Sequence, residues 1–129
     1  MMNKKDYGNA SEKQAEKFLR SKKHRIVARN YFSKHGEIDI ISVLPEKIVV
    51  FTEVRSKHAC TYGHPIETID ARKQQHIRQT AEKFLTDHPK YADYDCRFDV
   101  VTVVGEGKNA VLEYFPDAFW HEKVCFYWR

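Results

Sequence analysis

The sequence predicts an α/β protein of the α+β kind, in which a mixed β-sheet carries a helix on each side. Two helical patterns and five strand-like runs follow one another in the order α-β-β-β-α-β-β. Short connections join the first three strand-like runs, which favours antiparallel hairpins. A helix separates the third run from the fourth, so the sheet is expected to be mixed.

Two amphipathic segments predict the helices. In the first, Ser11 can act as the N-cap, and Ala15 and Leu19 lie on an apolar stripe at helical spacing. In the second, Asp70 caps a segment that runs to about His88 and repeats apolar residues with the same period. Each apolar stripe needs a surface to cover, and the strands provide it.

Five runs rich in β-branched and aromatic residues predict the strands. Gly36 and Pro45 mark tight turns between the first three runs, and residues 58–69 form a loop before the second helix. The predicted strands are residues 24–32, 37–44, 47–55, 96–104 and 110–115.

Neither a linker nor an internal repeat divides the chain, so we expect residues 1–129 to form a single domain, with the aromatic and charged tail 120–129 left unassigned. No apolar run approaches the ~20 residues that span a bilayer, and no secretory signal pattern begins the sequence. We therefore expect a cytoplasmic protein without a membrane partner. The three cysteines are odd in number and lie far apart, which favours reduced thiols over a disulfide framework or a zinc site.

The net charge of +4 permits an anionic partner. Basic residues gather in two groups, one within residues 1–30 and one between residues 55 and 78. A solvated surface is one explanation, but two basic groups in a small domain favour nucleic acid.

Two carboxylates fall on strand faces that otherwise carry apolar side chains. Alternation places Asp39 with Ile41 and Val43, and Glu53 with Phe51. A hairpin would bring the two carboxylates together, and buried like charges repel unless a cation compensates them. A salt bridge with a neighbouring arginine is one solution. The other is Mg²⁺ or Mn²⁺, which prefer oxygen ligands.

The helices add further polar candidates. Glu12 lies near the centre of the first apolar stripe and is directed at the sheet, although an acidic first turn also suits the helix dipole. Lys73 extends the second stripe, so it faces the same site or snorkels into solvent. Arg72 and His76 belong to a polar row that faces phosphate or solvent. Asp99, among valines, is expected to form a structural ion pair.

Several short motifs, spread over nearly the whole chain, resemble those of a known family. The main motif is Gly36-Glu-Ile-Asp-Ile-Ile41, followed by Val50-Phe-Thr-Glu-Val-Arg55. Further matches are Gly8-x-x-x-Glu12-x-x-Ala15, Arg29-Asn30-Tyr31, Tyr62-Gly63-x-Pro65, Asp70-Ala-Arg-Lys73, Arg97-Phe-Asp-Val-Val101 and Phe115-Pro-Asp-Ala-Phe119. The sequence is similar to the YraN-like family of small bacterial proteins, which is related to archaeal Holliday junction resolvases within the restriction-endonuclease-like superfamily, with its PD-(D/E)XK motif.

The resemblance implies a Mg²⁺- or Mn²⁺-dependent phosphodiesterase site on a restriction-endonuclease-like sheet flanked by helices. By position, Asp39 and Glu53 would be metal ligands and Glu12 an accessory catalytic acid. Arg55 takes the catalytic position of the motif's lysine, but arginine cannot act as a general base. Ile38 stands where the wider superfamily often has proline. The residues expected to contact nucleic acid are Lys57, Arg72, Lys73 and His76.

The leading functional hypothesis is an endonuclease that acts on DNA, including branched DNA, for which a homodimer would allow symmetric cuts. The alternative is a catalytically weak or inactive nucleic-acid-binding module with a nuclease-like fold. A third hypothesis makes the aromatic tail a protein-interaction segment.

Overall fold

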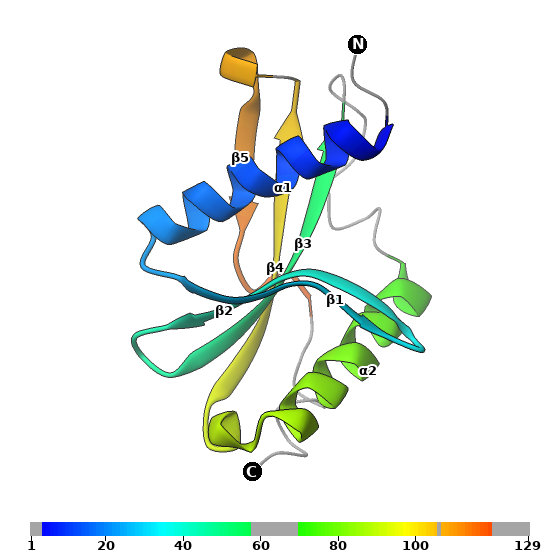
Figure 1. The fold of residues 1–129 in the computed structure, drawn as a ribbon, viewed down its shortest axis with the longest axis vertical. Coiled ribbons are helices and arrows are strands. Elements are labelled where there is room, and N and C mark those ends of the chain that lie inside the picture. The colour runs from blue at the N-terminus through cyan, green and yellow to red at the C-terminus, as the bar shows by residue number, and fades with distance from the viewer. Residues whose placement is uncertain (1–3, 58–69, 106, 120–129) are drawn as a thin grey trace.

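A computed structural model describes residues 4–57, 70–105 and 107–119 (Figure 1). The predicted order of helices and strands is confirmed. The elements are α1 (Lys4–Ser21), β1 (Arg25–Ser33), β2 (Gly36–Leu44), β3 (Ile48–Lys57), α2 (Ala71–Asp87), β4 (Asp95–Val104) and β5 (Val111–Phe115), with short 3₁₀ turns η2 (Pro89–Tyr91) and η3 (Gly107–Asn109).

The five strands form one mixed sheet in the order β1-β2-β3-β4-β5. Strands β1, β2 and β3 form an antiparallel meander, β3 pairs with β4 in parallel, and β4 pairs with β5 in antiparallel fashion. The crossover that contains α2 makes the parallel pair possible. The mixed sheet predicted from the sequence is therefore confirmed.

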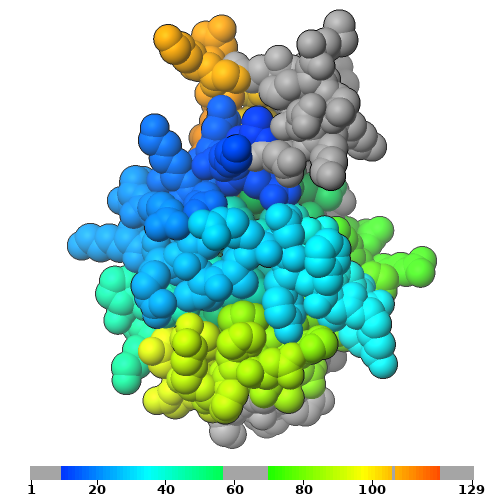
Figure 2. Space-filling view, viewed as in Figure 1, coloured from blue at the N-terminus to red at the C-terminus, as the bar shows by residue number. Residues whose placement is uncertain are grey.

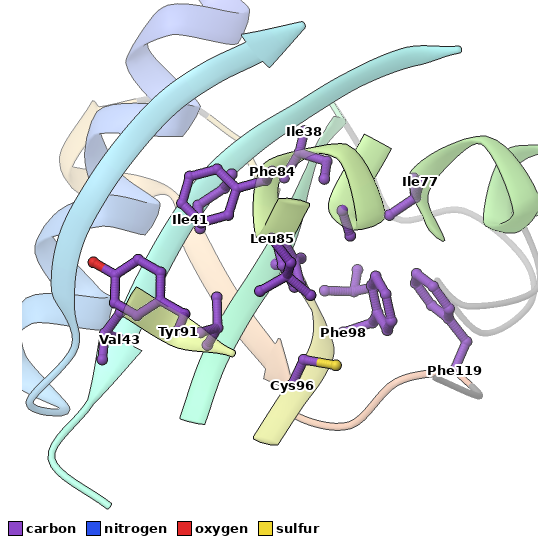
Figure 3. Packing of buried hydrophobic residues seen from close by; sticks show 14 residues of the cluster. Ile38, Ile41, Val43, Ile77, Phe84, Leu85, Tyr91, Cys96, Phe98 and Phe119 are labelled. Carbon is purple, nitrogen blue, oxygen red and sulfur yellow. The ribbon is translucent and has the colours of Figure 1, made fainter. Parts of the chain in front are cut away.

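Each helix covers its own core cluster, as expected for a sheet with helices on both faces. Under α2, the rings of Phe51 and Phe98 stack at 5.4 Å between centroids, and Phe84 meets Phe51 edge-on. Figure 3 shows Phe84 and Phe98 in this cluster. Under α1, Leu19 packs with apolar residues of β2 and β4, among them Ile40. Both amphipathic stripes predicted for the helices thus pack against the sheet.

Two local predictions are wrong. The first helix begins at Lys4, so Ser11 is a buried residue inside the helix and does not cap it. Serine tolerates a helix interior, which is why a cap signal alone misplaced this boundary. Cys96, 3% exposed, is disulfide-bonded, so the expectation of reduced thiols is wrong for this residue. Spacing along the sequence does not report which cysteines meet in the fold. By contrast, Asp70 does cap α2, because its side chain accepts a 2.8 Å hydrogen bond from the backbone N–H of Lys73.

Across the described ranges, none of the helices combines the length and hydropathy needed to cross a bilayer. The loop predicted at 58–69 and the tail 120–129 lie outside the described residues.

Candidate active site

The two candidate carboxylates lie where the sheet forks. Antiparallel pairs join β2 to β3 from the hairpin up to Ile40 and Thr52. The next residues on the two strands are Asp39 and Glu53. Beyond this point β3 remains paired with β4, as far as Lys57, and β2 remains paired with β1. The predicted meeting of Asp39 and Glu53 is therefore built by strand pairing on one side and strand separation on the other.

Asp39 fills the gap that the separation leaves. Its Oδ2 accepts a 2.8 Å hydrogen bond from the backbone N–H of Val54, the residue after Glu53. A side-chain carboxylate thus replaces the carbonyl that a continuing ladder would supply. This bond fixes the Asp39 side chain beside β3.

The side-chain alternation of β2 is interrupted at this position. Ile38 and Ile41 both pack in the core under α2, whereas Asp39 and Ile40, between them, both line a pocket beside α1. The prediction that Asp39 shares a face with Ile41 and Val43 is therefore wrong. Strict period-two alternation fails where a strand twists away from its neighbour.

The neighbouring strand β1 also has an irregular backbone conformation, at Asn30, and this residue positions Glu12. Asn30 has a positive φ of 49° and donates its side-chain amide to Oε1 of Glu12 at 3.0 Å. The preceding residue, Arg29, reaches the same helix and bonds Glu16, with Nε 2.9 Å from Oε2. Two consecutive β1 side chains therefore attach α1 to the sheet, and Glu12 faces the site as predicted.

These contacts enclose a pocket of about 230 Å³ between α1, β1 and β2. Carboxylates, cations, one amide and one isoleucine surround it. It is lined by Glu12, Lys13, Glu16, Arg29, Asn30, Asp39 and Ile40.

Two cations approach Glu53, Lys73 from α2 and Arg55 from β3 itself. The Lys73 Nζ lies 3.5 Å and the Arg55 Nη1 3.8 Å from the same oxygen of Glu53, which is 7% exposed. Both distances exceed the roughly 2.7–2.9 Å of a strong charge-assisted hydrogen bond. The salt bridge with Arg55, one of the two solutions considered from the sequence, is present, and Lys73 does face the site.

The carboxylates hold protons more tightly than usual. Burial, followed by repulsion from Asp39, raises the pKa of Glu53. Burial also raises the pKa of Asp39, although the Val54 N–H opposes this. Burial and the charges of Asp39 and Glu37 raise the pKa of Glu12 to about 7. The shifts indicate that burial and the repulsion among the carboxylates outweigh the effect of the cations Lys73 and Arg55.

A divalent metal ion fits this donor set in part. In residues 4–57, 70–105 and 107–119, no group of three or more His, Cys, Asp or Glu side chains is arranged to hold a metal ion. Mg²⁺, however, is usually held by one or two carboxylates, with water and substrate phosphate completing its shell. Asp39 and Glu53 supply that number of carboxylates, and a bound cation would offset the burial and repulsion that raise their pKa values.

The remaining predicted nucleic-acid contacts are less closely attached to the site. Arg72 is exposed and His76 half-buried on α2, and within the described part of the chain neither bonds a site carboxylate. Lys57 ends β3, and its side chain lies outside the description. Only Lys73, of the described residues in this set, reaches the carboxylates.

Asp99 has a structural role, as predicted. It is fully buried and accepts two 2.9 Å hydrogen bonds from Arg97, one on each oxygen. The Tyr114 hydroxyl and the backbone N–H of Asp117 also donate to it. Because donors from β4, β5 and the residues after β5 all bind this carboxylate, Asp99 holds these segments together and does not offer its oxygens to a ligand.

Sequence reasoning missed two residues of the site. Asn30 orients Glu12, and Glu37 adds negative charge next to Glu12 and Asp39. Glu37 lies two residues before Asp39, and this spacing was the available signal. The positive φ of Asn30 leaves no signal in composition or periodicity, although asparagine tolerates that conformation better than most residues.

Comparison with known proteins places the chain in a family. Residues 11–103 match the sequence profile of the uncharacterised protein family UPF0102. A UPF0102 protein of Alcanivorax borkumensis is 37% identical over 123 residues, which cover 95% of this chain and 98% of the relative. One from Desulforamulus reducens is 38% identical over 110 residues, covering 85% and 90% of the two chains. One from Pseudomonas entomophila is 39% identical over 113 residues, covering 87% and 91%. The chain therefore belongs to the uncharacterised protein family UPF0102, the YraN-like family that its motifs resemble.

Proposed function

We propose that the protein is a metal-dependent endonuclease that hydrolyses phosphodiester bonds in nucleic acid, with DNA as the expected substrate. One observation carries the proposal: Asp39 and Glu53 meet at the fork of β2 and β3, and two cations stand 3.5 and 3.8 Å from Glu53. The resemblance to the PD-(D/E)XK motif supports it, because the same residues match that motif. The description of the family states no activity.

Asp39 and Glu53 would hold Mg²⁺ or Mn²⁺. When bound, such an ion neutralises phosphate charge and lowers the pKa of a bound water, which makes a nucleophile available near neutral pH. The protein contributes a rigid mount for both carboxylates: strand pairing holds Glu53, and the Val54 N–H holds Asp39. A fixed geometry avoids the cost of reorganising the site during the reaction.

The cations of the site would act on the phosphate. Arg55 stays charged at all relevant pH values, so it can stabilise developing negative charge but cannot remove a proton. Lys73 supplies a second positive charge from α2, with 43% of its side chain exposed. An exposed ammonium at the edge of the site can bind a phosphate that approaches from solvent.

Glu12 is placed to exchange a proton. Its pKa of about 7 suits a group that gains and loses a proton near neutral pH. Asn30 occupies Oε1, which leaves Oε2 to accept a proton from the attacking water. Glu12 is thereby distinguished from Asp39 and Glu53, whose oxygens would serve as ligands.

A cleavage assay tests the proposal. The substrates are labelled single-stranded, duplex, flap and four-way-junction DNA together with RNA, each with Mg²⁺, Mn²⁺ or EDTA. Asp39→Asn and Glu53→Gln should abolish metal-dependent cutting. Glu82→Gln, which changes an exposed acid on α2 away from the carboxylates, should retain it. Equal cutting by all preparations would identify a contaminating nuclease and overturn the assignment.

The ion pair between Arg55 and Glu53 favours one second candidate, a nucleic-acid-binding module without catalysis. An arginine that cannot deprotonate in the position of the motif's lysine is consistent with lost activity. That function predicts binding that survives Asp39→Asn, needs no metal and weakens steeply with salt.

A further inference from the structure

The β1–β2 hairpin exposes an aromatic ring. Phe32, on β1, is 68% exposed, and Val111, on β5, is the other large apolar side chain exposed among the described residues, at 59%. The two strands form opposite edges of the sheet. Val111 therefore provides a comparison for Phe32, because it is similarly exposed but lies far from β2 in the strand order.

Neighbouring residues define the face on which Phe32 lies. Tyr31 packs edge-on against Phe84 of α2, with ring centroids 5.3 Å apart, and the Ser33 hydroxyl lies 2.7 Å from that of Thr80, also on α2. Both side chains point toward α2. Phe32, between them, lies on the opposite face, which is the face from which Asn30 reaches Glu12.

The pairing of β1 with β2 places this ring beside the acidic site. Phe32 pairs with Glu37 across the hairpin, and paired residues project their side chains from the same face. The charge of Glu37 acts on both Glu12 and Asp39, so Glu37 lies within electrostatic range of the site. Phe32 therefore lies next to Glu37, which in turn lies near the carboxylates Glu12 and Asp39.

Charged side chains of both signs surround the ring. Lys34, two residues on, is exposed, Glu37 lies opposite the ring, and Arg29, with 56% of its side chain exposed, pairs with Glu16 of α1. Figure 2 shows the hairpin, in cyan, on the molecular face between α1 in blue and α2 in green. A single ring among charged side chains is poorly suited to an apolar protein partner. It matches a nucleotide, which offers a flat base to the ring and an anionic phosphate to Lys34.

We propose that Phe32 stacks on an unpaired nucleobase next to the phosphate that a metal ion at Asp39 and Glu53 would bind, so that the substrate class is single-stranded or locally unpaired nucleic acid. This inference rests on the proposed function and narrows its substrate. A base inside a duplex is stacked on its neighbours and cannot offer its face to a ring at the protein surface. A flap, a junction arm or a single strand can.

The test measures binding in EDTA, so that no cleavage takes place. The probes are fluorescent oligo-dT and a duplex of equal length, followed by fluorescence anisotropy. Phe32→Ala should weaken oligo-dT binding about fivefold to a hundredfold and leave duplex binding unchanged. Phe32→Trp should restore binding, and Phe32→Leu, which is apolar but lacks a π face, should not. Val111→Ala should match the wild type.

Each other outcome counts against stacking. Oligo-dT binding that is unchanged in Phe32→Ala overturns the inference, as does full rescue by Phe32→Leu. A change in sedimentation of Phe32→Ala without a change in DNA affinity would assign the ring to an interface between copies of the chain. Failure of the proposed function looks different: loss of catalysis with the expected binding pattern rejects the nuclease alone, whereas a wild type that binds no nucleic acid rejects both.

Discussion

The backbone N–H of Val54 donates to the Oδ2 of Asp39 at 2.8 Å, across the point where β2 and β3 separate. The bond gives Asp39 a structural task in addition to any role as a ligand. It also means that substitutions of Asp39 affect stability in two opposite ways, because they remove both an acceptor and a buried negative charge.

Asp39→Ala and Asp39→Asn should therefore differ in stability. Alanine leaves the Val54 N–H without its acceptor, which costs about 1–3 kcal/mol. Asparagine keeps an acceptor oxygen and removes the repulsion with Glu53 and Glu37, so its free energy of unfolding should equal or exceed that of the wild type. Urea denaturation of the metal-free proteins at pH 8 measures both values. Equal stability of the two variants would contradict the structural task of Asp39.

Much of the fold could be predicted from the sequence because periodicity carries the necessary information. The stripe that contains Leu19 and the one that contains Phe84 do pack on opposite faces of the sheet. Strand limits were correct to within about two residues, since turn residues such as Gly36 mark them. Ser11 was misplaced because a hydroxyl that can cap a helix can also be buried inside one.

The site was predicted only in part. The predicted hairpin pairing of β2 with β3 correctly placed Asp39 near Glu53. The separation of the two strands after Ile40 and Thr52 could not be predicted, because it departs from the regular pairing that a periodic pattern indicates. Asn30 was overlooked for the same reason, because its role depends on an irregular backbone conformation. Residues that make up functional sites often sit where local rules fail.

Glu12→Gln should change how stability depends on pH. The pKa of Glu12 rises from 4.5 to about 7 on folding, so the native state binds more protons and loses stability as the pH rises through this range. Glutamine removes this loss and can still accept the Asn30 hydrogen bond. The variant should match the wild type at pH 4 and exceed its free energy of unfolding at pH 8 by up to about 1 kcal/mol, since solvent screens a partly exposed group. A difference that does not vary with pH would contradict the raised pKa.

Mg²⁺ should stabilise the protein more at pH 8 than at pH 5.5. Protons compete with the ion for carboxylates whose pKa values are raised, and ligand binding to the native state raises the melting temperature. Thermal denaturation with and without Mg²⁺ at the two pH values measures the effect. Glu53→Gln should lose it and Glu82→Gln should keep it. An equal Mg²⁺ effect in Glu53→Gln would place the ion elsewhere.

Asp99→Ala should destabilise the protein without touching the site. The substitution leaves the Arg97 guanidinium, the Tyr114 hydroxyl and the Asp117 N–H without their buried acceptor. Breaking a buried ion pair by removing one partner costs about 3–5 kcal/mol. Chemical denaturation should show this loss, whereas Asp93→Ala, on an exposed turn, should stay within about 0.5 kcal/mol of the wild type. Unchanged stability with altered Mg²⁺ binding would make Asp99 a site residue.

Lys73→Met should shift the pH at which Mg²⁺ binds. Lys73 is the nearer of the two cations that lower the pKa of Glu53, so its removal raises that pKa further and lets protons compete with the ion at higher pH. The midpoint of Mg²⁺ binding against pH, measured by isothermal titration calorimetry, should move upward. Lys83→Met is the matched control, because it removes a lysine from the same helix that pairs with Asp87 at 2.7 Å. An identical shift in both variants would indicate a general loss of positive charge. A shift confined to Lys73→Met would assign the effect to its contact with Glu53.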